Sequence, residues 1–201
     1  MIQQGTDEWK QLRLGKLTAS RMADAMAKKD TAAYKNYVAQ LVAERLTGQA
    51  GESFTNAAMA WGTEHEPLAR SEYEITTGFM VEQVPFVCHP EIEWCGASPD
   101  GMVNGDGLVE IKCPNTATHI DYLLAGKPPA KYVPQMALQL ICTGRKWCDF
   151  VSLDPRMPDQ HRLFVVRFQP EPAYLEKVDA AAREFLDEVA ATIERLQARA
   201  A

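Results

Sequence analysis

Long apolar runs are absent from this chain. Among its 201 residues, no stretch approaches 18 uninterrupted apolar positions, and the opening MIQQGTDEWKQ has no basic segment followed by an apolar one. The first absence argues against a membrane-spanning helix, and the second argues against a secretion signal. We therefore expect a cytoplasmic protein without a membrane segment.

Cysteine is scarce and irregularly spaced. The five cysteines form no CxxC pair, which argues against a disulfide framework and against a zinc site. We expect small buried side chains, three of them in strands: Cys88, Cys113 and Cys148. Internal repeats and low-complexity tracts are also missing, so the 201 residues suit a single domain over 1–201.

Positive charge is in short supply except near the N-terminus. A net charge of −6 argues against a protein that coats nucleic acid by bulk attraction. Residues 1–35 nevertheless carry seven Lys or Arg against four acids, an excess of three that leaves −9 for the remainder. Charge alone leaves two interpretations open, a mixed-charge solvated helix face or a local site for an anion.

The spacing of apolar residues is helical before residue 80 and predicts an N-terminal helical layer. The expected helices are a segment around Trp9 and Leu12, SRMADAMA with Thr18 as its cap, a long helix from Thr31 to Gly48, and a helix over about 56–78. Pro67 in the last of these cannot donate to the carbonyl of Thr63. A kink or a fresh helix start is therefore expected near Glu66.

After residue 80, short runs between turn residues predict strands. These runs are MVEQVPFVCH, EWCGAS, GMV, LVEIKC, KWCDFVSL and HRLFVVRF. Segments 118–126 and 131–143 indicate helices between them, and a final amphipathic helix starts near Pro172. The order predicts an α/β fold with a central mixed sheet flanked by helices, closed by the C-terminal amphipathic helix.

Two acids flank a predicted hairpin. The turn NGDG at 104–107 folds the strand that begins near Asp100 back beside the strand LVEIKC, so Asp100 and Glu110 can face each other. Alternation along LVEIKC places Glu110 and Lys112 on one face and the apolar residues on the other. The arrangement brings two carboxylates and an ammonium together.

Adjacent carboxylates repel unless a cation lies between them. Hard oxygen ligands favour Mg²⁺, with Mn²⁺ as a substitute, and Lys112 beside such a metal can orient or deprotonate a water. This is the chemistry of phosphodiester hydrolysis. The alternative is a solvated Glu and Lys on an exposed edge strand, and the spacing from Asp100 to Glu110 across a turn favours the nuclease.

The pattern PD, with ExK beginning ten positions after the aspartate, resembles the active-site signature of the restriction-endonuclease-like superfamily. Further segments resemble one branch of it, the lambda-phage-type viral (alkaline) exonucleases. In the order of that family they are WKQLRLGKLTAS from Trp9 to Ser20, AWGTEHEPLAR, SPDG, EIKCP, YVPQMALQL and LDPRM. Together they span residues 9–157.

The resemblance implies a prophage-type recombination enzyme. Its fold would be restriction-endonuclease-like, and its assembly a toroidal homotrimer. It would degrade one strand of linear double-stranded DNA from the 5′ end, release mononucleotides and leave a 3′ overhang. A single-strand annealing protein would be its partner.

The resemblance also implies roles for ten residues. Asp100, Glu110 and the carbonyl of Ile111 would hold Mg²⁺, Lys112 would activate the water, Gln135 would help position it, and Glu66 would complete the acidic site. At the DNA end, Arg13 and Ser20 would bind the 5′ phosphate and Ser98 would lie close to the reacting phosphate. Met59 would act as an apolar wedge between the strands.

Several of these residues have other interpretations. Glu66 could cap a helix ahead of Pro67, Gln135 and Gln139 could bond only to each other, Arg13 could form a surface salt bridge, Ser20 could be solvated and Met59 could belong to the core. A local signal nevertheless supports Ser20 as a phosphate-binding residue. Gly15 and the Thr18 cap predict a break that puts Ser20 in the first turn of a helix, where backbone N–H groups favour an anion.

Two rival functions stay open. An endonuclease of the same superfamily would share the metal site but would cut covalently closed circles, which an exonuclease leaves intact. A noncatalytic clamp on DNA ends would keep the fold and would have little need for Lys112 beside both acids.

Overall fold

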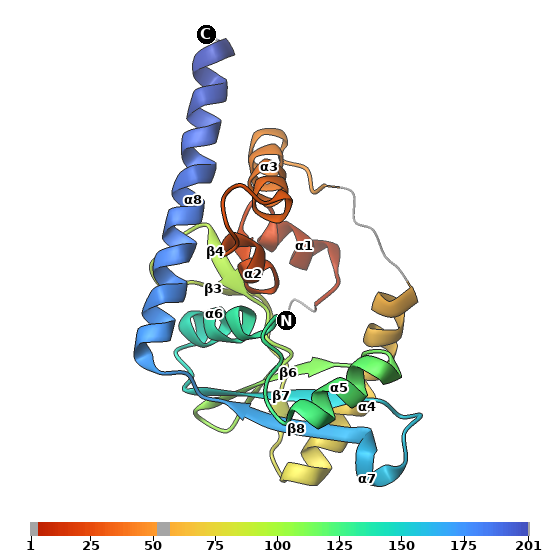
Figure 1. The fold of residues 1–201 in the computed structure, drawn as a ribbon. Helices are drawn as coiled ribbons and strands as arrows, with labels where there is room; N and C mark the ends of the chain where they lie inside the picture. The colour runs from red at the N-terminus through yellow and green to blue at the C-terminus, as the bar shows by residue number, and fades with distance from the viewer. Residues whose placement is uncertain (1–3, 52–56, 201) are drawn as a thin grey trace.

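The computed structural model describes residues 4–51 and 57–200, arranged as two sheets with helices packed around them (Figure 1). In chain order the described elements are α1 (Asp7–Arg13), β1 (Leu17–Thr18), the 3₁₀ helix η1 (Ala19–Arg21), α2 (Met22–Ala25), α3 (Ala32–Thr47), α4 (Ala57–Thr77), β2 (Val81–Glu82), β3 (Val87–Cys88), β4 (Cys95–Ala97), β5 (Gly101–Val103), β6 (Gly107–Lys112), α5 (Thr116–Ala125), α6 (Val133–Thr143), β7 (Trp147–Leu153), α7 (Asp159–Arg162), β8 (Leu163–Phe168) and α8 (Pro172–Ala200).

The larger sheet has five strands in the order β2-β5-β6-β7-β8. Strand β6 pairs antiparallel with β5 and parallel with β7, so the predicted mixed sheet is confirmed. Apolar residues of α4 pack on one face of β6 and β7, and those of α5 and α6 pack on the other. The strand that carries Glu110 is therefore central and covered on both sides, which excludes the solvated edge strand.

A second sheet of three strands, in the order β1-β4-β3, was not predicted. The run MVEQVPFVCH, predicted as one strand, divides into β2 and β3, which belong to different sheets. Pro85 lies between these two short strands and has no N–H for a sheet ladder. Strand β1, only two residues long, pairs with β4 in parallel.

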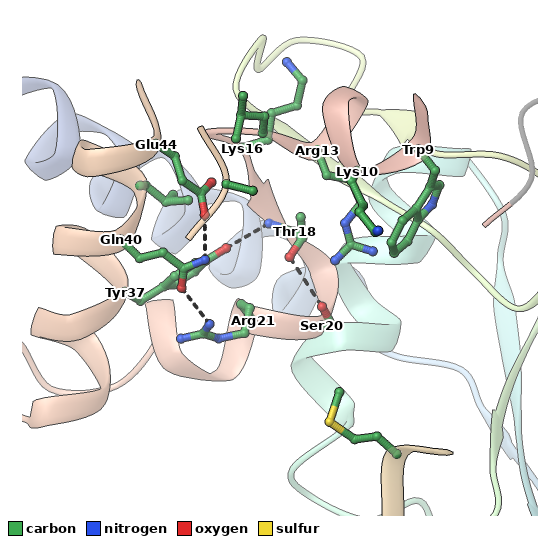
Figure 2. Close-up of a pocket in the computed structure, with 14 residues that line it drawn as sticks. Trp9, Lys10, Arg13, Lys16, Thr18, Ser20, Arg21, Tyr37, Gln40 and Glu44 are labelled. Carbon is green, nitrogen blue, oxygen red and sulfur yellow. Dashed lines mark hydrogen bonds between the residues drawn. The ribbon is translucent and has the colours of Figure 1, made fainter. Parts of the chain in front are cut away.

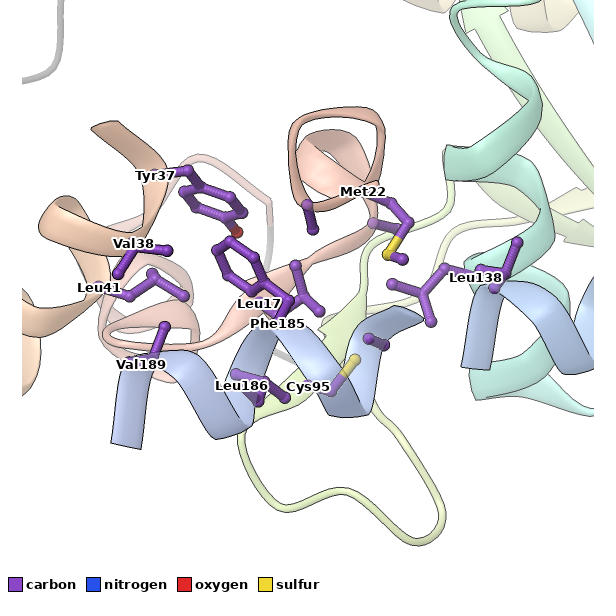
Figure 3. Packing of buried hydrophobic residues seen from close by; sticks show 14 of the residues in the cluster. Leu17, Met22, Tyr37, Val38, Leu41, Cys95, Leu138, Phe185, Leu186 and Val189 are labelled. Atoms are coloured by element: carbon purple, nitrogen blue, oxygen red, sulfur yellow. The ribbon is translucent and has the colours of Figure 1, made fainter. Parts of the chain in front are cut away.

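The N-terminal helices and α8 share one apolar core. Helix α3 begins and ends as predicted: the Thr31 side chain accepts from the N–H of Tyr34, and Gly48 takes a left-handed φ of 67°. Phe185 of α8 stacks on Tyr37 of α3 at a centroid distance of 5.0 Å, and Figure 3 shows the surrounding aliphatic side chains. The end of α8 extends past α3 in Figure 1.

Two helix predictions need correction. Helix α4 continues through Pro67, so the fresh start expected near Glu66 does not occur, although an interior proline costs a helix about 3 kcal/mol. The helix expected from SRMADAMA consists instead of η1 and the four-residue α2. The Thr18 side chain makes no capping hydrogen bond, and its hydroxyl lies 3.3 Å from that of Ser20.

All five cysteines are free thiols, and four of them are buried, as predicted, but Cys88 is exposed. Cys88 and Cys148 lie in strands as predicted, whereas Cys113 directly follows β6. Within residues 4–51 and 57–200, none of the helices combines the length and the apolar character that a bilayer crossing requires.

Candidate active site

Acidic side chains gather where the β5–β6 hairpin meets α4. Gly101 pairs with Val109, so the next residues outward, Asp100 and Glu110, lie across from each other. A Cβ on Gly101 would come within 2.1 Å of Val81, which explains the glycine that follows Asp100. The hairpin predicted from NGDG therefore brings the two carboxylates together.

A cavity of about 470 Å³ opens beside them, and we call it the acidic cavity. Its lining includes Asp100, Ile111 and Lys112 from the hairpin, Met59 and Glu66 from α4, and Tyr132 before α6. Oδ2 of Asp100 accepts from the N–H of Ile111 at 2.6 Å, which fixes that carboxylate.

Glu110 is fully buried, and both of its carboxylate oxygens accept hydrogen bonds from neighbouring side chains. Its Oε1 accepts from Nε2 of Gln135 at 2.6 Å and from the ammonium of Lys112, and its Oε2 accepts from Nε2 of Gln139 at 2.6 Å. The two glutamines thus hold Glu110 rather than each other. This role of Gln139 was not predicted from the sequence, although its position one helical turn after Gln135 is a signal that could have indicated it.

The charges in this cavity depend on one another. Burial, and then the nearby charges of Glu110 and Glu66, raise the pKa of Asp100 well above its usual range, while Lys112 opposes them. Burial alone would lower the pKa of Lys112, but Glu110 and Asp100 raise it. Lys112 is therefore an ammonium that donates to Glu110 in this arrangement.

Cys113 also lines the acidic cavity, but its chemistry differs from that of the acids. Burial, with the charge of Glu66 adding to it, raises the pKa of its thiol to about 12. A thiol with that pKa stays protonated at neutral pH, and a protonated thiol is a poor nucleophile and a poor metal ligand. The reactive groups of the cavity are oxygen ligands and the ammonium.

The donor atoms present fit Mg²⁺. A carboxylate offers about four acceptor positions, and three of those on Glu110 are used; Oδ1 of Asp100 makes no hydrogen bond within the described residues. Among those residues no three His, Cys, Asp or Glu side chains already form a metal-binding group. A cation here would need backbone carbonyls and waters as well, which is how Mg²⁺ is commonly bound.

Glu66 lies inside α4, so it does not cap a helix. Its Oε1 accepts from Nη2 of Arg70 at 2.7 Å, one helical turn later. Besides the acidic cavity, Glu66 and Thr63 line a neighbouring cavity of about 390 Å³ together with Trp9, Pro67 and Arg70, which we call the flanking cavity. Glu66 therefore stands at the wall between the two.

A third cavity, of about 380 Å³, lies between α1, η1 and α3, and we call it the N-terminal cavity (Figure 2). It collects Arg13 and Ser20 from separate elements, because Gly15 turns the chain with a φ of +69° after α1. Ser20 lies in the first turn that follows, as predicted, but that turn is the short η1 and not an α-helix N-terminus.

Arg13 differs from the other cations of the N-terminal cavity. Lys10 pairs with Asp7, Lys16 donates to the carbonyl of Glu93, and Arg21 pairs with Asp24. Within the part of the chain that the structure describes, the Arg13 side chain makes neither an ion pair nor a hydrogen bond; its guanidinium stacks 3.9 Å from the centroid of the Trp9 ring. The predicted alternative of a surface salt bridge is therefore wrong, and Arg13 can accept an external anion.

Ser98 and Met59 connect the cavities. Oγ of Ser98 accepts from Nε1 of Trp9 at 3.0 Å, so Ser98 supports the wall of the N-terminal cavity while lying two residues before Asp100. Met59 is 54% exposed and lines both the N-terminal and the acidic cavities. Met59 is therefore not a core residue, and it lies between the N-terminal cavity and the acidic cavity.

A mixed sheet with an acidic hairpin at its centre defines the class of restriction-endonuclease-like folds to which viral recombination nucleases belong. The chain belongs to the family of the YqaJ-like viral recombinase domain, whose model matches residues 8–146. The resemblance to lambda-type alkaline exonucleases is thereby confirmed.

Solved structures agree with this assignment. An alkaline exonuclease (LHK-Exo) from Laribacter hongkongensis matches with 48% sequence identity and a TM-score of 0.92, over 97% of this chain and 98% of LHK-Exo. LHK-Exo in complex with dAMP gives the same values. A phage related exonuclease from Haemophilus somnus 129PT shares the fold, with 16% identity and a TM-score of 0.69 over 90% and 96% of the two chains. No curated protein matches the sequence.

Proposed function

We propose that this chain is a Mg²⁺-dependent exonuclease that degrades one strand of linear double-stranded DNA from its 5′ end. It releases mononucleotides and leaves a 3′ overhang for homologous recombination. The observation that carries the proposal is that Met59 forms a wall of both the N-terminal and the acidic cavities. The 48% identity with an alkaline exonuclease supports the same activity.

The N-terminal cavity would hold the 5′ phosphate. The Arg13 guanidinium has no anionic partner among the described residues, and a guanidinium binds a phosphate through strong, paired hydrogen bonds. Ser20 adds a hydroxyl from the same cavity, and Ser98 lies on the path toward Asp100. Met59, exposed between the two cavities, would act as the wedge that separates the strands.

The acidic cavity would carry out hydrolysis. Asp100, Glu110 and the carbonyl of Ile111 would hold Mg²⁺, which supplies positive charge for the phosphoryl oxygens and lowers the pKa of a water. Gln135 and Gln139 fix Glu110 through its two oxygens. The ammonium of Lys112 would orient the attacking water and stabilise charge on phosphorus, and Glu66 would complete the acidic site.

The decisive experiment uses linear duplexes labelled at the 5′ or the 3′ end, digested with and without Mg²⁺. We expect early release of the 5′ label as a mononucleotide, retention of the 3′ label and no release without the metal. Mn²⁺ should substitute. Covalently closed circles are the control, since cleavage of circles would identify the rival endonuclease, and binding of ends without hydrolysis would identify the clamp.

The proposal extends to assembly and partner. A ring of three subunits would enclose the DNA, and the overhang would pass to a single-strand annealing protein. A pull-down of the purified exonuclease with such a protein tests the second point. Its control is a nuclease-unrelated protein of similar negative charge, because acidic surfaces alone can retain a basic partner.

A further inference from the structure

Pro67 removes a hydrogen bond from α4 beside the acidic cavity. It lies inside the helix, and without an N–H it cannot donate to the carbonyl of Thr63, four residues earlier. That carbonyl therefore lacks the donor that a helical carbonyl normally has at this spacing. An oxygen in this state is available to a ligand or to ordered water.

Thr63 lies on the face of α4 that borders the cavities. A helical carbonyl points along the axis toward the residues three and four positions later, which are Glu66 and Pro67. Thr63 and Glu66 line both the acidic and the flanking cavities, and Pro67 lines the flanking cavity. This part of α4 thus stands at the border of the two cavities.

Negative and partly negative oxygens converge at this border. Arg70 donates to Oε1 of Glu66 at 2.7 Å, which restrains that carboxylate. The charge of Glu66 reaches Asp100, whose pKa it helps to raise after the larger effects of burial and Glu110. Acceptors from α4 and from the hairpin therefore surround the same volume.

We propose that the Thr63 carbonyl, released by Pro67, accepts a hydrogen bond from the hydration shell of the divalent cation bound in the acidic cavity. This inference rests on the proposed metal site. Mg²⁺ retains several waters in protein sites, and protein groups that orient the outer shell influence metal affinity by about 10- to 100-fold. Pro67 then lowers the stability of α4 while it raises cation affinity.

The test compares Pro67→Ala and Pro67→Gly with the wild type, without DNA. Both variants restore the N–H, so the Thr63 carbonyl regains its helical donor. Mn²⁺ binding, measured by electron paramagnetic resonance of the free ion, should weaken by about tenfold in both variants. The Tm should rise by about 5 °C in Pro67→Ala and by less in Pro67→Gly, because glycine favours the helix less.

Matched controls separate the carbonyl from helix stability. Thr76→Ala changes an exposed position of the same helix without affecting the Thr63 carbonyl, and it should leave Mn²⁺ binding unchanged. Wild-type affinity in both Pro67 variants, or weakening in Pro67→Ala alone, would overturn the inference. Equal Mn²⁺ binding by the wild type and Asp100→Asn would instead overturn the proposed metal site, and the inference with it.

Discussion

Glu110 shows how a single buried charge is stabilised in this protein. A carboxylate with no exposure to water loses its hydration, and it persists only where hydrogen bonds and an opposite charge replace it. Gln135, Gln139 and Lys112 provide these contacts from α6 and from β6 itself. The same contacts fix the orientation of the carboxylate, so stability and the proposed metal site would depend on one arrangement.

Replacing Lys112 by Ala should slow hydrolysis by about 10²- to 10⁴-fold, because the charge that orients the water and stabilises the phosphorus is lost. Binding of DNA ends should persist. The measurement is single-turnover release of labelled nucleotide, with circular dichroism to verify folding. Lys131→Ala is the matched control, since its ammonium lies 4.8 Å from the Tyr132 ring centroid on the neighbouring segment. Near-normal hydrolysis by Lys112→Ala would contradict the active-site assignment.

Arg13→Ala should slow digestion of 5′-phosphorylated duplex about tenfold to a hundredfold, since a hydrogen bond to a charged group contributes roughly 1.5 to 3 kcal/mol. Release of the first nucleotide from a duplex with a 5′-hydroxyl end should be affected little, because that end lacks the phosphate that Arg13 would contact, so the rates compared are those of first-nucleotide release. The ratio of the two rates is the measurement. Lys10→Ala, which removes an ammonium already paired with Asp7, should leave that ratio nearly unchanged. An equal slowing of both substrates by Arg13→Ala would remove Arg13 from the phosphate site.

The sequence predicted the composition of the site better than its internal contacts. Alternation and the NGDG turn were enough to pair Asp100 with Glu110, because both signals are local. The contacts of Gln139 and the separation of the cavities by Met59 depend on how α6 and α4 dock on the sheet, and no local pattern specifies that docking. Arg13 illustrates the same limit, since the absence of a partner is a property of the folded environment.

At the scale of elements, the junction after β7 joins three segments through one carboxylate. Asp154 is fully buried and accepts from the hydroxyl of Thr116 at 2.6 Å and from Nε of Arg156 at 2.7 Å. The Arg156 guanidinium lies 4.5 Å from the Trp61 ring centroid. The junction therefore ties the end of β7 to the start of α5 and, through Arg156, to α4, the helix that carries Met59 and Glu66.

This junction should make stability depend on acid pH. Burial alone would raise the pKa of Asp154, but hydrogen bonds from Arg156 and Thr116 lower it to about 2, whereas an unfolded aspartate has a pKa of about 3.9. Because the folded pKa is the lower one, the stabilisation is present above about pH 4 and is lost as the pH falls toward 2.

Denaturant unfolding of the wild type and of Asp154→Asn at several pH values measures this effect. Asp154→Asn should be less stable at pH 7, and the difference should shrink between about pH 4 and pH 2 as the wild-type carboxylate takes up its proton. Asp159→Asn, at an exposed position on α7, is the control and should show little difference at any pH. A constant deficit of Asp154→Asn down to pH 2 would contradict the assigned cause.

Elements with strong local signals were predicted, and those that depend on distant pairing were not. Helix α3 carries its own cap and its own terminal glycine, and β7 and β8 are long enough for their composition to identify them. Strand β1 has two residues, and its identity as a strand comes from pairing with β4, which is distant in the sequence. The continuity of α4 through Pro67 likewise depends on packing against β6 and β7, which overrides the local preference.

At the scale of the whole molecule, the net negative charge opposes the binding of DNA that the proposed function requires. The chain carries a net charge of −6, so long-range attraction would not retain a polyanion at physiological salt. The cations that could contact DNA are gathered around the N-terminal cavity, where Lys10, Arg13, Lys16 and Arg21 meet. A protein of this kind holds DNA either weakly at one end or by enclosing it.

Enclosure requires a closed ring, and the proposed ring has three subunits. Light scattering should give about three times the subunit mass of 22.4 kDa, and a value near one subunit would exclude the ring. Retention gives an independent measurement: protein loaded on labelled linear duplex should continue to digest it after excess unlabelled duplex is added, because an enclosing ring leaves only at the end of the strand. A single subunit held by Arg13 and the acidic cavity would dissociate and be captured by the competitor, so digestion of the labelled duplex would stop. Arg13→Ala should digest the loaded duplex more slowly than the wild type yet resist capture by the competitor equally well, since the ring and not the end contact prevents release.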